Sequence, residues 1–340
     1  MSSKNKLDLN EFYRHRLEPR EVDPIDVEAL CKIASRRGIG KSVKPQGDKS
    51  MLVILSDWQT GKAEGGGTEA IVQRVTFYQD QLIHRLRELN KNGKNINTVY
   101  AVSVGDLIEQ CSGFYDMQTF GTDQDRREQM RIARRLVMRL VDLLVDEGYN
   151  VVLGAVPGNH GENRNAYSGK AYTTWTDNDD LAIFDGVAEI IAHNKERYAN
   201  VDIPLGAIAD DLTMTINISG IEAGFAHGHT FRNGGNKNYV KTNGTIGKIE
   251  SWWLGQSMGR QPIAKADLLF CGHLHHFVAS GATGRHVFMA PAADGGSHWF
   301  TSTTGQSYPA GMLTLLVGEG CGPLGWSDLQ ILWDSLDTTI

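Results

Sequence analysis

The sequence of 340 residues predicts an α/β fold built on a parallel β-sheet, and three observations support this prediction. Short apolar runs, typical of strands buried on both faces, alternate with long amphipathic helices in the first half of the chain. Each of these strands ends in polar residues. The second half is rich in strand-like segments. Because functional groups gather at the carboxyl ends of parallel strands, we expect the site there.

The first 50 residues differ from the rest of the chain. They are charged and weakly periodic, with a predicted helix from Val27 to Arg36 and a linker rich in glycine and lysine after it. We therefore interpret residues 1–50 as an N-terminal appendage and residues 51–340 as a single domain.

The first half of that domain repeats one unit of strand and helix. Continuous apolar runs predict the strands, and apolar residues at helical spacing predict the helices. The predicted strands are residues 51–55, 98–104 and 150–156, and the predicted helices are residues 68–90, 123–147 and 177–193. Residues 110–148 form a helical insertion between the second and third strands.

The second half of the domain lacks this repeat and instead has short apolar segments bounded by turn residues. The strands predicted here are residues 212–218, 221–226, 267–271, 286–290, 312–317 and 329–333. Residues 231–248 are rich in glycine, asparagine and basic residues. We interpret them as a basic loop.

Composition excludes several classes of protein. The four cysteines are scattered without a CxxC pair, which argues against a disulfide framework and a thiolate zinc site. A net charge of −6 argues against a protein that coats nucleic acid, although it leaves room for a local basic strip. No run approaches the roughly 18 apolar residues of a membrane span, and the N-terminus is too polar for a signal peptide. We expect a cytoplasmic protein that does not bind membranes.

Five polar clusters follow apolar strands directly. They are DWQ at residues 57–59, GDLIE at 105–109, GNHGE at 158–162, AHGH at 226–229 and GHLHH at 272–276. Together they supply carboxylates, an asparagine and several imidazoles. This mixture of oxygen and nitrogen donors without thiolate suits Mn²⁺, Fe²⁺ or Zn²⁺. Two ions that share one carboxylate would use all of these donors. Such a pair of ions could bind the attacking and leaving oxygens of a phosphoryl group.

The order of these clusters resembles the calcineurin-like metallophosphoesterase superfamily over roughly residues 51–295. The resemblance implies a four-layer α/β/β/α sandwich and a phosphoester hydrolase with a binuclear metal centre and a bridging hydroxide. It implies two divalent ions, for which we expect manganese, with iron, zinc or magnesium as alternatives. The implied ligands are Asp57, Gln59 and His275 for the first ion, Asn159, His227 and His273 for the second, and Asp106 between them. His160 matches a histidine that contacts the phosphate and helps to protonate the leaving oxygen.

Two residues depart from the pattern of that superfamily. Gln59 stands where a histidine is usual, and its amide oxygen is a weaker and harder donor. This change predicts a weak first metal site that prefers Mn²⁺. Glu109 replaces an aspartate that usually supports a ligand, and one extra methylene there is tolerable.

Other residues are candidates for supporting a ligand or contacting substrate. They are Glu109, Glu162, Arg164, His229 and His276. A phosphate contact and a solvated side chain are equal alternatives for Arg164. Glu162 is expected to orient a neighbour. For His229 and His276, a supporting role and metal ligation are both open.

The resemblance implies a phosphoester substrate, and we expect DNA. The helical insertion and the basic loop resemble the nuclease and phosphodiesterase branch, with compact nucleases of phage or bacterial origin as the leading comparison. Arginines between residues 126 and 139 form either a solvated helix face or a strip that tracks phosphates. Trp252 and Trp253 are core residues or stacking platforms for bases. The alternatives are a small-molecule phosphodiesterase or phosphomonoesterase, for example on cyclic nucleotides, and a non-catalytic scaffold. Exonuclease or endonuclease action and oligomeric state stay open.

Overall fold

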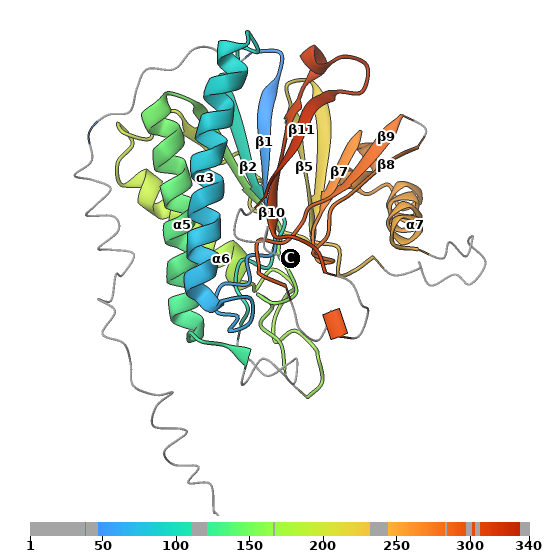
Figure 1. Ribbon diagram of the computed structural model, residues 1–340. Coiled ribbons are helices and arrows are strands. Elements are labelled where there is room, and N and C mark those ends of the chain that lie inside the picture. The colour runs from blue at the N-terminus through green and yellow to red at the C-terminus, as the bar shows by residue number, and fades with distance from the viewer. Residues whose placement is uncertain are drawn as a thin grey trace, which may run out of the picture.

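A computed structural model describes most of the domain and little of the N-terminal segment. The described residues are 38, 47–110, 121–165, 167–231, 244–282, 284–296, 301–302 and 307–333. The predicted helix from Val27 to Arg36, most of the appendage and the centre of the basic loop lie outside them. Two β-sheets pack face to face, with helices on both outer faces (Figure 1). The predicted four-layer α/β/β/α sandwich is confirmed.

The first sheet brings the predicted strand ends to one edge. Its order is β11-β10-β1-β2-β3-β4. The strands are β1 (Ser50–Leu55), β2 (Thr98–Ser103), β3 (Asn150–Ala155), β4 (Val201–Asp202), β10 (Gly311–Val317) and β11 (Trp326–Trp333). β1 to β4 are parallel, and Leu55 pairs with Ser103, which pairs with Ala155. The three following turns therefore leave the sheet side by side.

Three helices cover the outer face of this sheet: α3 (Gly67–Lys91), α5 (Arg126–Glu147) and α6 (Asp179–Ala192) (Figure 1). Each lies within a few residues of its predicted range. α5 begins at Asp125, whose carboxylate accepts the backbone N–H of Glu128, and ends at Gly148 in the left-handed conformation that favours glycine. The apolar faces of these helices and the sheet form one continuous core.

The second sheet has the order β5-β6-β7-β9-β8. Its strands are β5 (Thr213–Ile218), β6 (Ile221–Ala226), β7 (Leu268–Cys271), β8 (Val278–Ala282) and β9 (Arg285–Met289). A second apolar core fills the space between the sheets. β6, β7 and β9 are parallel, so their carboxyl ends also share one edge.

Helix α7 (Thr245–Met258) covers the outer face of the second sheet and begins inside the segment predicted as basic loop (Figure 1). Ile249 and Trp253, one helical turn apart, are buried against that sheet. The indole Nε1–H of Trp253 donates to the Ile263 carbonyl at 3.0 Å, so this tryptophan is a core residue. Trp252 packs on Phe231 with ring centroids 4.4 Å apart.

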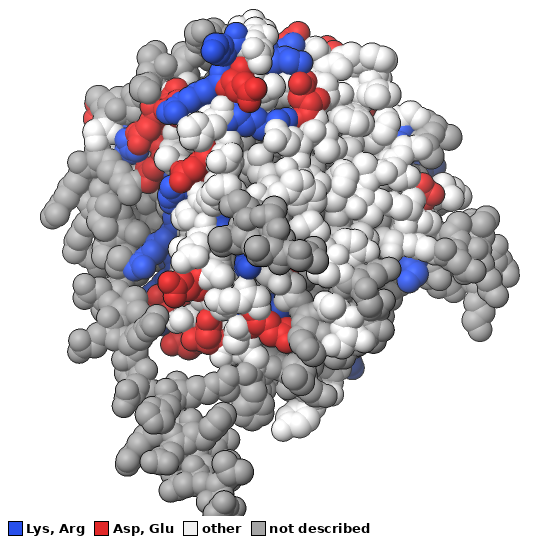
Figure 2. All heavy atoms as spheres, in the orientation of Figure 1, with Lys and Arg blue, Asp and Glu red and all other residues white. Residues whose placement is uncertain are grey.

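Three of the arginines of α5, Arg126, Arg131 and Arg139, form ion pairs with carboxylates. Arg126 pairs with Asp179 at 2.5 Å, and Arg139 pairs with Asp80 at 2.7 Å. Figure 2 shows basic and acidic side chains of the described residues interspersed over the helical layer. These contacts favour the solvated-face interpretation. Within the described residues, no helix has the length and apolar character needed to cross a membrane.

Candidate metal centre

The five predicted clusters meet at the edge where both sheets end. The Nδ1 atom of His227, after β6, lies 2.7 Å from the carbonyl of Val104, after β2. The backbone N–H of His273, after β7, donates to the Asp57 carboxylate, after β1, at 3.0 Å. Clusters more than 120 residues apart in sequence are therefore in direct contact.

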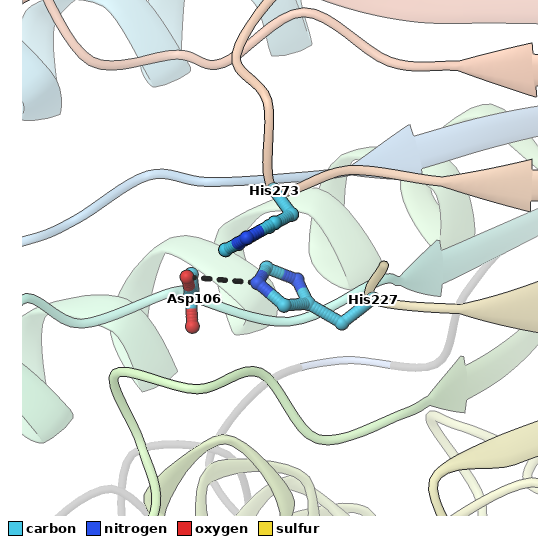
Figure 3. Close-up of side chains that lie close together, drawn as sticks. All are labelled: Asp106, His227 and His273. Carbon is cyan, nitrogen blue, oxygen red and sulfur yellow. Dashed lines mark ion pairs between the residues drawn. The ribbon is translucent and has the colours of Figure 1, made fainter. Parts of the chain in front are cut away.

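Four predicted ligands form what we call the second half-site: Asp106, Asn159, His227 and His273. One ligand atom from each of Asp106, His227 and His273 lies within 4.8 Å of the other two (Figure 3). His227 Nε2 lies 2.9 Å from Asp106 Oδ2 and 2.9 Å from Asn159 Oδ1. The donor set is compact enough for a single divalent ion.

The imidazole of His227 is held in the orientation that a metal ligand needs. Its Nδ1–H donates to the Val104 carbonyl, so Nε2 is the atom that faces Asp106 and Asn159. Burial would lower the pKa of His227, but the Asp106 carboxylate outweighs it and raises that pKa to about 9. Burial and the neighbouring His227 lower the pKa of His273 to about 4, so this imidazole is neutral. The second half-site therefore favours a cation beside Asp106, and the neutral imidazole of His273 can bind that cation.

Three other predicted ligands form what we call the first half-site: Asp57, Gln59 and His275. His275 Nε2 lies 3.4 Å from Asp57 Oδ1, and its Nδ1 lies 3.5 Å from Asp294 Oδ1. Burial would lower the pKa of His275, but Asp294 and Asp57 raise it well above its ordinary value. Gln59 Oε1 accepts a hydrogen bond from Lys62 Nζ at 3.1 Å. An ammonium group therefore already contacts this half-site.

His160 lies at the boundary between the half-sites. Its Nδ1–H donates to the Glu109 carbonyl at 2.9 Å, which leaves Nε2 facing the site. That Nε2 is 3.3 Å from Gln59 Nε2 and 3.9 Å from Asp106 Oδ2. Nε2 is thus the atom that would pass a proton to a leaving oxygen, as the resemblance implies.

Two supporting candidates hold the turn that carries Asn159. Arg164 Nη2 donates to the Asn159 carbonyl at 2.8 Å and pairs with Glu162 Oε2 at 2.5 Å. Glu162 Oε1 also lies 3.3 Å from His229 Nε2. Glu162 thus contacts both Arg164 and His229, and Arg164 contacts the turn that carries a predicted ligand.

The remaining candidates are Glu109 and His276. Glu109 is buried, and burial raises its pKa to about 7. His276 stacks on Tyr308 with ring centroids 4.7 Å apart, and its Nδ1 lies 2.7 Å from the Leu274 carbonyl. These contacts place His276 on the rim of the site.

Five of the ten described non-glycine residues with a positive φ are predicted ligands. Asp57, Gln59, Asp106, His273 and His275 all have φ between 46° and 71°, in the left-handed region that residues with side chains seldom adopt. Such conformations cost about 1–3 kcal/mol each and cluster where function requires a particular side-chain direction. The strain therefore marks both half-sites.

Asp180 is a supporting residue that the sequence analysis missed. Its buried carboxylate accepts the backbone N–H groups of Asp106 at 2.9 Å, Leu107 at 2.9 Å and Gly158 at 3.0 Å. It therefore ties the turns after β2 and β3 together. Two acidic residues in the first turn of α6 are also what a helix N-terminus favours, so the sequence carried no distinct signal.

Replacing Asp180 with Asn should weaken Mn²⁺ binding by about 10–100-fold, because an amide cannot accept all three N–H groups with both of its terminal atoms. Calorimetric titration of Mn²⁺ measures this change. Asp179→Asn is the matched control, because Asp179 is next in sequence but pairs with Arg126 instead. Equal Mn²⁺ affinity in the two variants would contradict the role assigned to Asp180.

The fold and the clustered residues agree with the resemblance found in the sequence. A four-layer sandwich whose strand ends bring together aspartate, asparagine and histidine side chains is the architecture that the resemblance to calcineurin-like metallophosphoesterases implies. The resemblance inferred from the five clusters is thus confirmed at the level of the fold.

Among the comparisons with known proteins, only the search of solved structures found similar chains. No family model matches the sequence, and no curated protein matches it. Vacuolar Protein Sorting 29 from Cryptosporidium parvum is 12% identical over 85% of this chain and 98% of its own, with a TM-score of 0.38. Vps29 from Entamoeba histolytica in complex with Zn²⁺ is 10% identical over 84% and 98%, with a TM-score of 0.34. A predicted phosphoesterase from Streptococcus pneumoniae TIGR4 is 10% identical over 79% and 83%, with a TM-score of 0.30. Similarity at this level does not extend to activity.

Proposed function

We propose that the chain is a metal-dependent phosphoester hydrolase that cleaves phosphodiesters. The observation that carries this proposal is the second half-site, where Asp106, Asn159, His227 and His273 converge. A bound divalent ion would supply a Lewis acid that activates water and neutralises charge on the phosphoryl oxygens. The mixed oxygen and nitrogen donors support manganese as the preferred ion.

The chain's own residues have separate roles in this proposal. Asp106 and Asn159 hold the cation with oxygen donors, and His227 and His273 hold it with ring nitrogens. His160 donates a proton through Nε2 to the leaving oxygen, and the Glu109 carbonyl keeps that ring in place.

We propose DNA as the substrate on the basis of what we call the aromatic hairpin, residues 163–165 and 167–177. It follows directly on the turn that carries Asn159 and His160, and two backbone bonds close it: Tyr172 N–H to the Asn163 carbonyl and Asn165 N–H to the Lys170 carbonyl. Tyr167, Tyr172 and Trp175 are 100%, 63% and 52% exposed. Exposed aromatic rings beside a phosphodiester site are platforms on which unpaired bases stack.

One panel of substrates tests the proposed function. With Mn²⁺ present, we expect turnover of a bis-aryl phosphodiester and of labelled single-stranded DNA, and a KM for DNA that rises steeply with salt. An aryl monoester, cyclic nucleotides and double-stranded DNA complete the panel. Turnover of cyclic nucleotides with no dependence on salt would favour the small-molecule alternative. No turnover with manganese, iron, zinc or magnesium would favour the scaffold.

Replacing Tyr167 and Trp175 together with Ala should raise the KM for single-stranded DNA by at least about 30-fold, because two stacking rings are lost and each stacked base contributes about 1–3 kcal/mol. Turnover of the bis-aryl diester should change much less, because that substrate carries no nucleobases to stack on these rings. Leu324→Ala is the control: Leu324 is 51% exposed and lies at the opposite edge of the first sheet, near the start of β1. An unchanged KM for DNA in the double variant would exclude the hairpin from substrate binding.

A further inference from the structure

We propose that Lys62 supplies the cation of the first half-site, so that the chain takes up one divalent ion, at the second half-site, instead of the two that the resemblance implies. The ammonium group would then bind a non-bridging oxygen of the substrate phosphate. This proposal rests on the proposed function and concerns the same site.

Lys62 is held in the first half-site by its backbone and by its side chain. Its N–H donates to the Gln59 carbonyl at 3.0 Å, which closes the turn after β1. Its side chain is only 12% exposed. Nζ donates to Gln59 Oε1 at 3.1 Å and forms an ion pair with Asp294, whose side chain is 3% exposed. A lysine with so little of its side chain exposed is uncommon unless its charge is paired.

One side-chain partner of Lys62, Gln59, is a predicted ligand of a first metal ion, and the other, Asp294, contacts another such ligand. Asp294 Oδ1 lies 3.5 Å from Nδ1 of His275, a predicted ligand of that ion. Gln59 Oε1 is the only oxygen of the Gln59 side chain, and it already accepts the ammonium. A divalent ion bound to the same oxygen, at about 2 Å, would lie close to the ammonium and be repelled by it. The first half-site therefore does not fit a metal ion while Lys62 is present.

The glutamine explains how a lysine can take this place. A histidine at position 59 could present a neutral ring nitrogen to a metal, whereas the amide offers an oxygen acceptor to an ammonium. With Oε1 held by Lys62, the amide turns Nε2 toward His160 Nε2, 3.3 Å away. Because an ammonium is a compact point charge that binds phosphate oxygens, it can stabilise the negative charge of the reacting phosphate from this side.

The experiment measures how many Mn²⁺ ions each variant binds, by calorimetry and by metal analysis after gel filtration. We expect one ion per wild-type chain. Lys62→Met combined with Gln59→His should bind a second ion at least about 10-fold more tightly than the wild type does, and electron paramagnetic resonance should then show two coupled Mn²⁺ ions. Lys62→Arg, which keeps the charge, should still bind one. Lys94→Met is the matched control, because it removes an ammonium paired with Asp328 at 2.8 Å away from the site.

Activity gives a second readout. Lys62→Met should lower kcat for the bis-aryl diester by about 100-fold at low Mn²⁺ and recover part of it at high Mn²⁺, when an ion replaces the ammonium. Two ions of similar affinity in the wild type would overturn the proposal, and so would a double variant that still binds one. Stoichiometries as expected without hydrolysis in any variant would uphold the assignment of Lys62 as the cation and refute the proposed function instead.

Discussion

Replacing Asp106 with Asn is expected to lower hydrolysis of the bis-aryl diester by at least about 1000-fold. The Asp106 carboxylate is buried and makes two contacts that both need an acceptor. Oδ1 accepts the backbone N–H of His160 at 2.8 Å, and Oδ2 lies 2.9 Å from His227 Nε2. An amide keeps the shape but removes the negative charge and places an N–H group against one of these partners. The variant should therefore bind the ion more weakly, and His160 should be held less firmly in its position.

Steady-state kinetics with saturating Mn²⁺ and calorimetric titration of Mn²⁺ measure the two effects of Asp106→Asn. Asp202→Asn is the control, because this exposed carboxylate in β4 has no part in either half-site. If Asp106→Asn keeps more than a tenth of wild-type activity, hydrolysis does not occur at the second half-site.

Replacing Gly158 with Ala should destabilise the fold by about 3 kcal/mol, as expected when a methyl group is forced into a packed region. A Cβ on Gly158 would collide with the backbone nitrogen and the carboxylate of Asp106. The backbone cannot move aside easily. The Gly158 N–H donates to Asp180 at 3.0 Å, and its carbonyl accepts Asn178 Nδ2 at 2.8 Å. The collision should also displace Asp106 and lower Mn²⁺ affinity.

Urea denaturation measures the free energy of unfolding of the Gly158→Ala variant. Gly255→Ala is the control, because Gly255 lies in α7 with no atom within 4 Å of an added Cβ, and Ala favours the helix there. An equal free energy of unfolding in the two variants would show that the turns after β2 and β3 tolerate being pushed apart.

Most elements of the fold could be predicted because their side chains repeat with the period of the element. β1 is apolar and buried throughout, and α3 and α5 carry one apolar face each. Three of the described strands and α-helices lacked that signal, and one of them, β4, has only two residues. α7 is rich in glycine and polar residues and buries only Ile249 and Trp253, and β8, with the sequence VASGA, has a small-residue composition that resembles a loop.

The candidate ligands were predictable because short motifs mark the ends of strands. The residues that hold these ligands in place were not predictable. Asp180 belongs to a helix start, and nothing around Lys62 or Asp294 forms a motif. Their importance comes from the contacts they make with residues far away in sequence: Asp294 lies 232 residues from Lys62. The sequence around Lys62 therefore could not predict that its ammonium contacts Gln59.

The sequence by itself determined the class of fold, the strand ends and the side chains able to bind a cation, because apolar periodicity and local motifs are properties of neighbouring residues. Only the tertiary structure decided which of those side chains meet. Strand pairing aligned Leu55, Ser103 and Ala155, and packing of the two sheets brought His227 and His273 to Asp106. The same packing put a lysine ammonium against Gln59, because the position of a charge depends on long-range contacts that no local pattern encodes.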